Sequence, residues 1–139
     1  MWKGSRFKAK LCLAAGILTI AIGANPVFAA YADGDKVYRG GQCGAGNFTA
    51  GTGITTDTSG KLSNVSVYVA PGQSDAVATA TIKNGKIGVS TIGKIRAAGG
   101  TVVASANGTS QYHATLSGIT AATAESLFAT SLIPNPNKC

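Results

Sequence analysis

Alternating apolar and polar residues predict a half-buried strand in the middle of the chain. In residues 61–70, KLSNVSVYVA, the valines fall on one side, whereas Ser66 and Tyr68 fall on the other. Residues 36–39 form a shorter strand-like run, and the rest of the segment from 31 to 60 is rich in glycine. We expect that early segment to be mostly loop.

Two later strand-like runs, residues 101–106 and 109–117, flank Asn107-Gly108, a dipeptide typical of hairpin turns. Because side chains alternate along a strand, the second run has two faces. One face is expected to carry Tyr112, Ala114 and Leu116, and the other Gln111, His113, Thr115 and Ser117. The pattern therefore places His113 and Thr115 side by side on a polar face.

A short helix is predicted between these strand-like regions. Ser90 or Thr91 is a suitable N-cap, isoleucines at 92 and 95 have the spacing of a buried helical face, and Gly99 is suited to the C-terminal end. Lys94 and Arg96 are then expected to point to solvent.

Two more segments have helical signals. A helix capped by Thr120 is expected to bury Ala124, Leu127 and Phe128. Residues 74–82 fit either a helical turn capped by Ser74 or another strand, and we favour the turn. Asn84-Gly85 predicts a tight turn after it, and the prolines of the tail are expected to prevent regular structure at the C-terminus. The predicted fold is α+β: one domain with a small antiparallel sheet and two or three short helices.

The first 29 residues have the layout of a secretory signal peptide. Four basic residues precede an apolar run, which ends at Asn25-Pro26 and small residues. The spacing favours cleavage after Ala29, with Ala32 as a second option, and the short run argues against a membrane anchor. We expect a secreted or periplasmic protein, residues 30–139, that is a monomer and not membrane-bound after cleavage.

Charge becomes informative once the leader is set aside. The chain has 12 Lys and Arg and five Asp and Glu, and four of the basic residues lie in the leader, so the remainder carries 8 − 5 = +3. The basic residues that matter lie in the segment 83–118, and no Asp or Glu occurs between Asp75 and Glu125. Such a segment suits a phosphate-bearing ligand better than a metal ion, and we expect no metal and no cofactor.

Cys43 and Cys139 remain after the leader is removed. An even pair in an exported chain favours one structural disulfide between them over a catalytic thiol.

His113 is the only histidine and the sharpest catalytic candidate. Cleavage of RNA without a metal needs a general base, a general acid and groups that stabilise charge on the phosphate. His113 suits the first or second task, with Thr115, Lys94 and Arg96 for the third, and Tyr112, Lys86 and Arg39 as further substrate contacts. The alternative is an exposed strand histidine with no role.

Tyr38-Arg39-Gly40-Gly41 suggests a different enzyme class. The segment is similar to the first strand of mono-ADP-ribosyltransferases, whose arginine holds the dinucleotide. Those enzymes also use a glutamate on a late strand, whereas Glu125 lies in a predicted helix. The missing carboxylate counts against this class.

Five motifs together resemble a known family of domains: YRGG at 38–41, NGKIGVSTIGKIRAAGG at 84–100, YHATLSGIT at 112–120, AESLF at 124–128 and PNPNK at 134–138. They resemble the C-terminal toxin domains of bacterial polymorphic toxins of the Rhs and contact-dependent-inhibition type, over about Val37 to Lys138. The resemblance implies a toxin that cleaves nucleic acid, often on the fold shared by barnase, EndoU, colicins D and E5 and RelE. It also implies an immunity protein as partner, which we expect to be acidic. One departure from the family is that we expect this chain to carry its own signal peptide in place of a large delivery protein.

The sequence therefore predicts a secreted, metal-independent ribonuclease-like toxin that cleaves RNA by attack of the 2′-OH, with His113 as general acid or base. A non-catalytic secreted binding protein is the alternative, and an ADP-ribosyltransferase is the third possibility.

Overall fold

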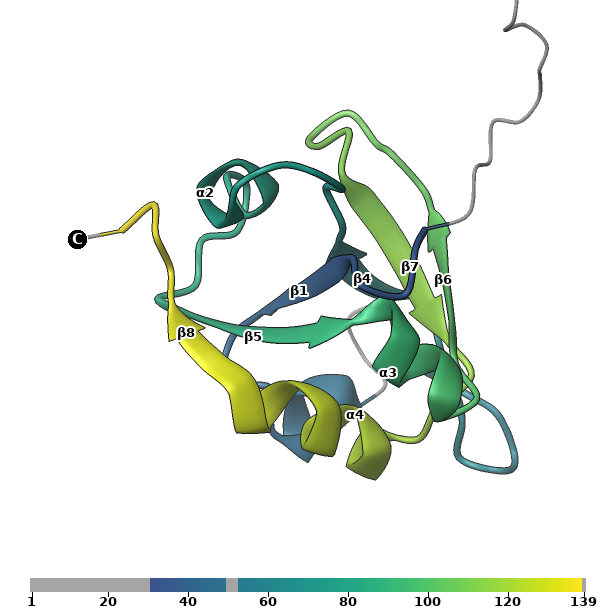
Figure 1. The fold of residues 1–139 in the computed structure, drawn as a ribbon. Helices are drawn as coiled ribbons and strands as arrows, with labels where there is room; N and C mark the ends of the chain where they lie inside the picture. The colour runs from purple at the N-terminus through teal and green to yellow at the C-terminus, as the bar shows by residue number, and fades with distance from the viewer. Residues whose placement is uncertain (1–30, 50–52, 139) are drawn as a thin grey trace, which may run out of the picture. The chain divides into compact units, whose positions relative to one another are not determined.

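A computed structural model describes residues 31–49 and 53–138 (Figure 1). Residues 31–139 form one compact unit. The predicted signal peptide, residues 1–29, lies outside the described residues, as does Cys139. None of the helices in the described ranges has the length and apolar character needed to cross a bilayer.

The described chain forms an antiparallel six-stranded sheet with three short α-helices, which confirms the predicted α+β class. The strand order is β6-β7-β4-β1-β5-β8, and β2 and β3 form a separate pair. The strands are β1 (Lys36–Gly40), β2 (Thr55–Thr56), β3 (Leu62–Ser63), β4 (Val65–Tyr68), β5 (Lys86–Thr91), β6 (Thr101–Ala104), β7 (His113–Ser117) and β8 (Leu132–Pro134). The helices are η2 (Ala45–Phe48), α2 (Asp75–Ala78), α3 (Ile92–Ala97), α4 (Ala121–Phe128) and η3 (Ala129–Ser131).

The sheet has an apolar cluster on each face. Valines 65 and 67 of β4 belong to the larger cluster, together with Ile92 and Ile95 of α3 and Phe128 of α4. The smaller cluster contains Tyr38 of β1 and Ala78 of α2. Figure 1 accordingly shows α2 above β1 and β5, and α3 and α4 below them. Ser66 and Tyr68 alternate with the buried valines, so they face away from the larger cluster, as their spacing predicted.

All three predicted helices begin at their predicted caps. The hydroxyl oxygen of Ser74 accepts a hydrogen bond from the Val77 backbone N–H, and Thr91 and Thr120 play the same part for α3 and α4. Gly99 follows α3 with a φ of 92°, which is favourable for glycine. These capping signals depend on residues within one turn of each other, which is why the sequence was sufficient to find them.

The hairpin of β6 and β7 is also as predicted, but its loop is longer than a two-residue turn. Eight residues, 105–112, separate the strands, and the Asn107 side chain accepts hydrogen bonds from the backbone N–H groups of Thr109 and Ser110. Tyr112 therefore lies outside β7 and packs against the smaller apolar cluster. The expectation that it shares a face with Ala114 was wrong, because the strand starts one residue later.

One prediction fails at the opposite end of the sheet. The tail does form a strand, β8, whose residues 132–134 pair with β5. Proline is tolerated there because β8 is an edge strand and Pro134 is its last residue. Asn84-Gly85 lies where the chain bends and leads into β5, an interior strand that was not predicted.

Candidate functional site

His113 is half-buried on β7, on the face of the sheet away from α3 and α4. Its Nε2 lies 3.0 Å from Ser66 Oγ on the neighbouring strand β4. Its Nδ1 lies 3.0 Å from the backbone oxygen of Ser105 and 2.9 Å from Ser105 Oγ, both in the β6–β7 loop. The imidazole is therefore hydrogen-bonded on both sides.

These contacts determine which nitrogen of the neutral ring carries the proton. A backbone carbonyl oxygen only accepts hydrogen bonds, so we assign the proton to Nδ1, which donates it to Ser105 O. Nε2 is then an acceptor, and the Ser66 hydroxyl donates to it. The neutral imidazole thus offers a lone pair toward Ser66.

Thr115 lies beside His113, as the alternation of the sequence predicted. Its Oγ1 is 2.8 Å from Ser105 Oγ, which also contacts the imidazole. The ring of Tyr68 stands edge-on to the imidazole, with 5.5 Å between the ring centroids. Thr115 therefore supports His113 through Ser105.

Arg39 lies on β1 and its guanidinium is held without a carboxylate. Nη1 donates to the backbone oxygen of Ser66 at 2.9 Å, and Nη2 donates to that of Asn47 at 3.2 Å. The guanidinium carbon lies 5.5 Å from the ring centroid of Phe48. Burial lowers the pKa of Arg39, against smaller raising influences of Cys43 and Tyr68. The group still carries its charge at neutral pH, because an arginine starts from so high a pKa.

A cavity of about 430 Å³ opens beside Arg39. The residues lining it that bear on binding are polar or basic: Arg39, Asn47, Ser66, Tyr68, Thr81 and Lys83. None of its lining residues is acidic. Within the described chain, Arg39 Nε and Thr81 Oγ1 are buried without a hydrogen-bond partner. The cavity thus combines positive charge with unused hydrogen-bonding groups, which favours an anionic ligand.

The glycines of the 38–41 motif shape the rim of this cavity. A Cβ on Gly40 would lie 2.3 Å from Asn84 Oδ1 and 2.8 Å from Ile82 Cγ2. Gly41 has a φ of 102°, a conformation that suits glycine. The motif next to Arg39 therefore allows the 82–84 segment to lie directly against β1.

Ser66 connects the cavity to the histidine. It lines the cavity and hydrogen-bonds to His113, whereas His113 and Thr115 are not among the lining residues. Ser66 and Ser105 were not predicted as site residues, and Lys83 was predicted only as one of the basic residues of the segment 83–118. Only the pairing of β4 with β7, in which Ser66 lies opposite Thr115 and Tyr68 opposite His113, brings Ser66 to the imidazole.

Lys94 and Arg96 are not brought to His113. Their helix, α3, packs its isoleucines into the cluster that contains Ala114 and Leu116, so it covers the opposite face of β7. Arg96 forms an ion pair with Asp33 at 2.7 Å and donates to Tyr31 O. The predicted grouping of His113 with these two cations is therefore not present, and the basic residues that line the cavity together with Ser66 are Arg39 and Lys83.

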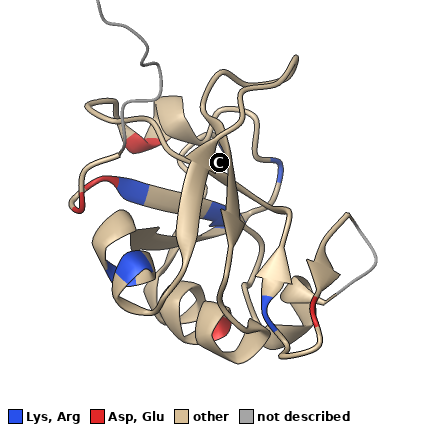
Figure 2. Cartoon of the chain, turned by 90° about the vertical axis from the view of Figure 1, so that its right-hand side faces the viewer, with Lys and Arg blue, Asp and Glu red and all other residues tan. Residues whose placement is uncertain are grey.

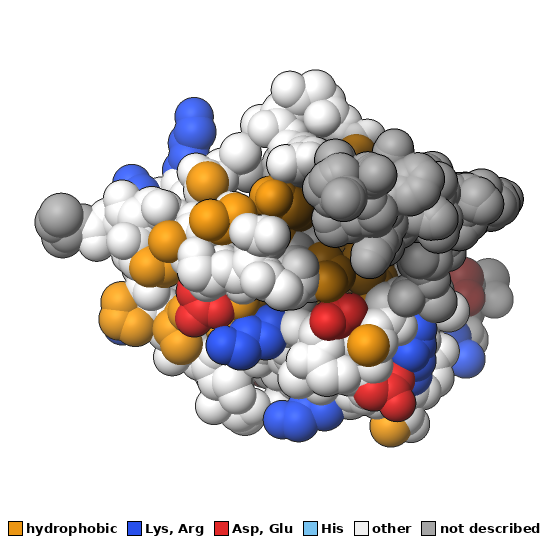
Figure 3. All heavy atoms as spheres, turned by 45° about the horizontal axis from the view of Figure 1, so that its top comes forward, with side chains coloured by type: hydrophobic (Ala, Val, Ile, Leu, Met, Phe, Trp, Pro, Cys, Tyr) orange, Lys and Arg blue, Asp and Glu red, His pale blue; other side chains and the backbone are white. Residues whose placement is uncertain are grey.

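Of the other predicted substrate contacts, Arg39 lines the cavity and the remaining two do not. Lys86 is exposed at the start of β5, opposite Pro134 of the edge strand. Across the described residues, the views in Figures 2 and 3 show basic and acidic groups interspersed, without a continuous basic face. The case for an anionic ligand therefore depends on the cavity and not on overall charge.

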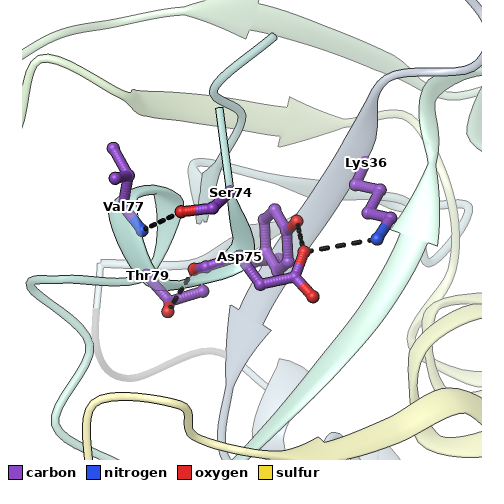
Figure 4. A network of polar contacts seen from close by, with 6 residues as sticks. Lys36, Ser74, Asp75, Val77 and Thr79 are labelled. Atoms are coloured by element: carbon purple, nitrogen blue, oxygen red, sulfur yellow. Dashed lines mark hydrogen bonds and ion pairs between the residues drawn. The ribbon is translucent and has the colours of Figure 1, made fainter. Parts of the chain in front are cut away.

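A second polar cluster lies where β1 meets α2 (Figure 4). The Asp75 carboxylate accepts a hydrogen bond from the Tyr38 hydroxyl and pairs with Lys36 at 3.3 Å. The pKa of Asp75 is lowered, chiefly by the hydrogen bond from Tyr38. Lys36 lowers it further through a hydrogen bond and its positive charge, whereas burial acts in the opposite direction. The pKa of Tyr38 is raised, mainly by burial and further by the hydrogen bond to Asp75 and the negative charge of Asp75. Lys94 lies near this cluster, since it lines a smaller cavity of about 290 Å³ with Lys36 and Asp75.

Cys43 is buried in the larger cluster and is bonded to no other cysteine among the described residues. Burial raises the pKa of the thiol, against a hydrogen bond from the Gly88 backbone and the charge of Arg39. A thiol kept protonated is a poor nucleophile, which agrees with a structural role for Cys43. Its predicted disulfide partner, Cys139, lies outside the described residues.

Comparison of the chain with protein-family models, with curated proteins and with solved structures found no match.

Proposed function

We propose that the protein is a metal-independent ribonuclease whose cavity beside Arg39 binds a phosphate group of RNA. The observation that supports this most directly is the carboxylate-free cavity, whose lining contains both the half-buried Arg39 and Ser66, the hydrogen-bond partner of His113. We also propose that the protein acts as a secreted toxin and that its partner is an acidic immunity protein. That part rests on the sequence resemblance and on the predicted signal peptide.

In this mechanism, the substrate supplies its own nucleophile. Rotation of the Ser66 side chain about χ1 frees Nε2 of His113, which accepts the proton of the 2′-OH as the 2′-oxygen bonds to phosphorus. The bond from phosphorus to the 5′-oxygen breaks, and this oxygen leaves with the electron pair and takes a proton from water. Arg39 and Lys83, which line the cavity, stabilise the charge that develops on the phosphate oxygens. This assignment gives Arg39 and Lys83 the task that the sequence analysis gave to Lys94 and Arg96.

The test is cleavage of total RNA by the purified protein in EDTA. We expect discrete fragments from the wild type, no fragments with His113→Ala or His113→Gln, and no cleavage of an oligonucleotide that carries 2′-deoxy sugars throughout. Ser117→Ala is the matched control, because Ser117 lies on the same strand face as His113 but does not line the cavity. The thermal midpoint of each variant shows that it is folded. Cleavage by folded His113→Gln, or of the deoxy oligonucleotide, would contradict the mechanism.

A non-catalytic binding protein is the second candidate, because both ring nitrogens of His113 are already hydrogen-bonded within the sheet. It predicts intact RNA in all samples, together with binding of RNA that weakens on Arg39→Gln. The ADP-ribosyltransferase possibility has less support, since Glu125 is exposed on α4 and does not line the cavity. Consumption of NAD by the purified protein would favour it over the other two.

A further inference from the structure

Ser66, His113 and Ser105 form a linked series of a hydroxyl, a base and a group that orients the base. The Ser66 hydroxyl donates to Nε2 at 3.0 Å, and the opposite nitrogen donates to the Ser105 carbonyl at 3.0 Å. This is the arrangement by which a serine is activated as a nucleophile: one partner removes its proton and a third holds the base in the required tautomer. A ribonuclease that uses the 2′-OH of its substrate has no need of such a serine.

The orientation of the base is reinforced by the hairpin loop. Ser105 contacts Nδ1 through both its backbone oxygen and its hydroxyl, and the hydroxyl also contacts Thr115 Oγ1 at 2.8 Å. The ring of Tyr68 packs edge-on against the imidazole. The ring is therefore held by Ser105 at Nδ1 and by the packing of Tyr68, while Nε2 remains directed at Ser66.

The surroundings of Ser66 indicate the class of electrophile. Ser66 lines the cavity, and its backbone oxygen is bound by Arg39 Nη1 at 2.9 Å. Arg39 and Thr81, which line the cavity, each hold a buried polar atom without a partner, and Lys83 adds a second positive charge. Tetrahedral phosphoryl groups match this combination of donors and charge.

We propose that Ser66 is a nucleophile toward phosphoryl electrophiles bound in this cavity, with His113 as its general base. In the reaction, Ser66 Oγ forms a bond to phosphorus, and its proton moves to His113 Nε2. The bond from phosphorus to the leaving group breaks, and the leaving group departs with that electron pair. The product is a phosphoryl ester of Ser66.

Diisopropyl fluorophosphate is a direct probe, because its leaving group is fluoride and no RNA is involved. After incubation with the full protein, we expect the intact mass to rise by one diisopropylphosphoryl group, with the modified peptide mapped to Ser66. Ser66→Ala is expected to give no adduct. His113→Gln, which keeps an amide in place of the base, is expected to slow labelling by about 100-fold or more.

A control variant separates this chemistry from structural effects. Ser117→Ala, on the same face of β7, is expected to label like the wild type. Absence of an adduct on the folded wild type, an adduct on another residue, or an unchanged rate in folded His113→Gln would overturn the inference.

The outcome is distinguishable from that of the proposed ribonuclease. Labelling of Ser66 without any RNA cleavage would support the nucleophile and contradict the ribonuclease. If the protein cleaved RNA only where a 2′-OH is present and formed no adduct, the result would support the ribonuclease and contradict the nucleophile.

Discussion

At the scale of single residues, Asp75 shows how one carboxylate joins parts of the fold that are distant in sequence. It lies in the first turn of α2 and binds the Tyr38 hydroxyl and Lys36, both from β1 (Figure 4). The pKa of Asp75 is lowered and that of Tyr38 is raised by this arrangement. The hydrogen bond therefore favours the charged carboxylate and the neutral phenol.

Tyr38→Phe is expected to lower the free energy of unfolding by about 1 to 2 kcal/mol at pH 7, because Asp75 loses a hydrogen-bond donor. The contribution of Asp75 is present above its unfolded pKa of about 4 and is lost as the pH falls through its lower folded pKa. The contribution of Tyr38 is present below about pH 10 and is lost as the pH rises through its raised folded pKa. Urea unfolding at a series of pH values from 2 to 11 measures how the free energy of unfolding changes in the acid range and in the alkaline range.

In the Tyr38→Phe variant, stability should depend less on pH in both windows. Tyr112→Phe is the control, since no described hydrogen bond involves the Tyr112 hydroxyl. If the free energy of unfolding of Tyr38→Phe decreased in acid as much as that of the wild type, the contact between Tyr38 and Asp75 would not stabilise the fold.

At the scale of elements, the central strand β5 needs a glycine where helix α4 lies against it. A Cβ on Gly88 would lie 2.6 Å from Cys43 Sγ and 2.9 Å from both Cβ and the backbone oxygen of Phe128. The φ of Gly88 is not in the positive region, so the requirement is one of space. This glycine lets α4 and Cys43 pack close to the sheet.

Gly88→Ala is expected to reduce the free energy of unfolding by about 1 to 3 kcal/mol, because the added methyl group overpacks the core. Gly34→Ala is a matched control: no atom lies within 4 Å of its Cβ position, and its φ is not positive. Chemical denaturation of the two variants and the wild type gives the comparison. Equal stability of the two variants would mean that α4 shifts away from β5 without loss.

The elements also show how far sequence reasoning reaches. Thr91 and Thr120 were found as caps, and β4 as a strand, because capping and alternation are local patterns. β5 was not found, because Gly88 and Ser90 interrupt its apolar pattern. Gly88 lies against α4, and Ser90 is a buried polar residue. β8 was not found because an edge strand with a proline has no alternation to recognise, and its pairing partner is more than 40 residues away.

At the scale of the whole molecule, Asn135 ties the C-terminal tail to the rim of the cavity. Its side-chain nitrogen donates to the backbone oxygens of Ile82 and Asn84, at 2.9 and 2.8 Å, and its backbone N–H donates to Gly85. Asn135 is 2% exposed, so water does not replace these bonds readily. The tail therefore helps to position the segment that carries Lys83.

Asn135→Ala is expected to lower the free energy of unfolding by about 2 kcal/mol, because two backbone oxygens lose their donor in a buried place. It is also expected to increase hydrogen exchange at the amides of residues 83–85. Lys138→Ala, at an exposed position of the same tail, is the control. Exchange rates at 83–85 that match those of the control would show that the tail does not hold the rim.

The sequence by itself determined the class of the fold, the starts of the three helices and the side-by-side placement of His113 and Thr115. Each of these follows from residues only a few positions apart, whose relation is set by the geometry of one helix or one strand. The tertiary structure decided the rest of the candidate site: Ser66 against His113, Arg39 in an acid-free cavity, and Lys94 and Arg96 on the other face of the sheet. Those relations depend on strand order and register, which join positions as far apart as 47 residues and have no signature in the local pattern.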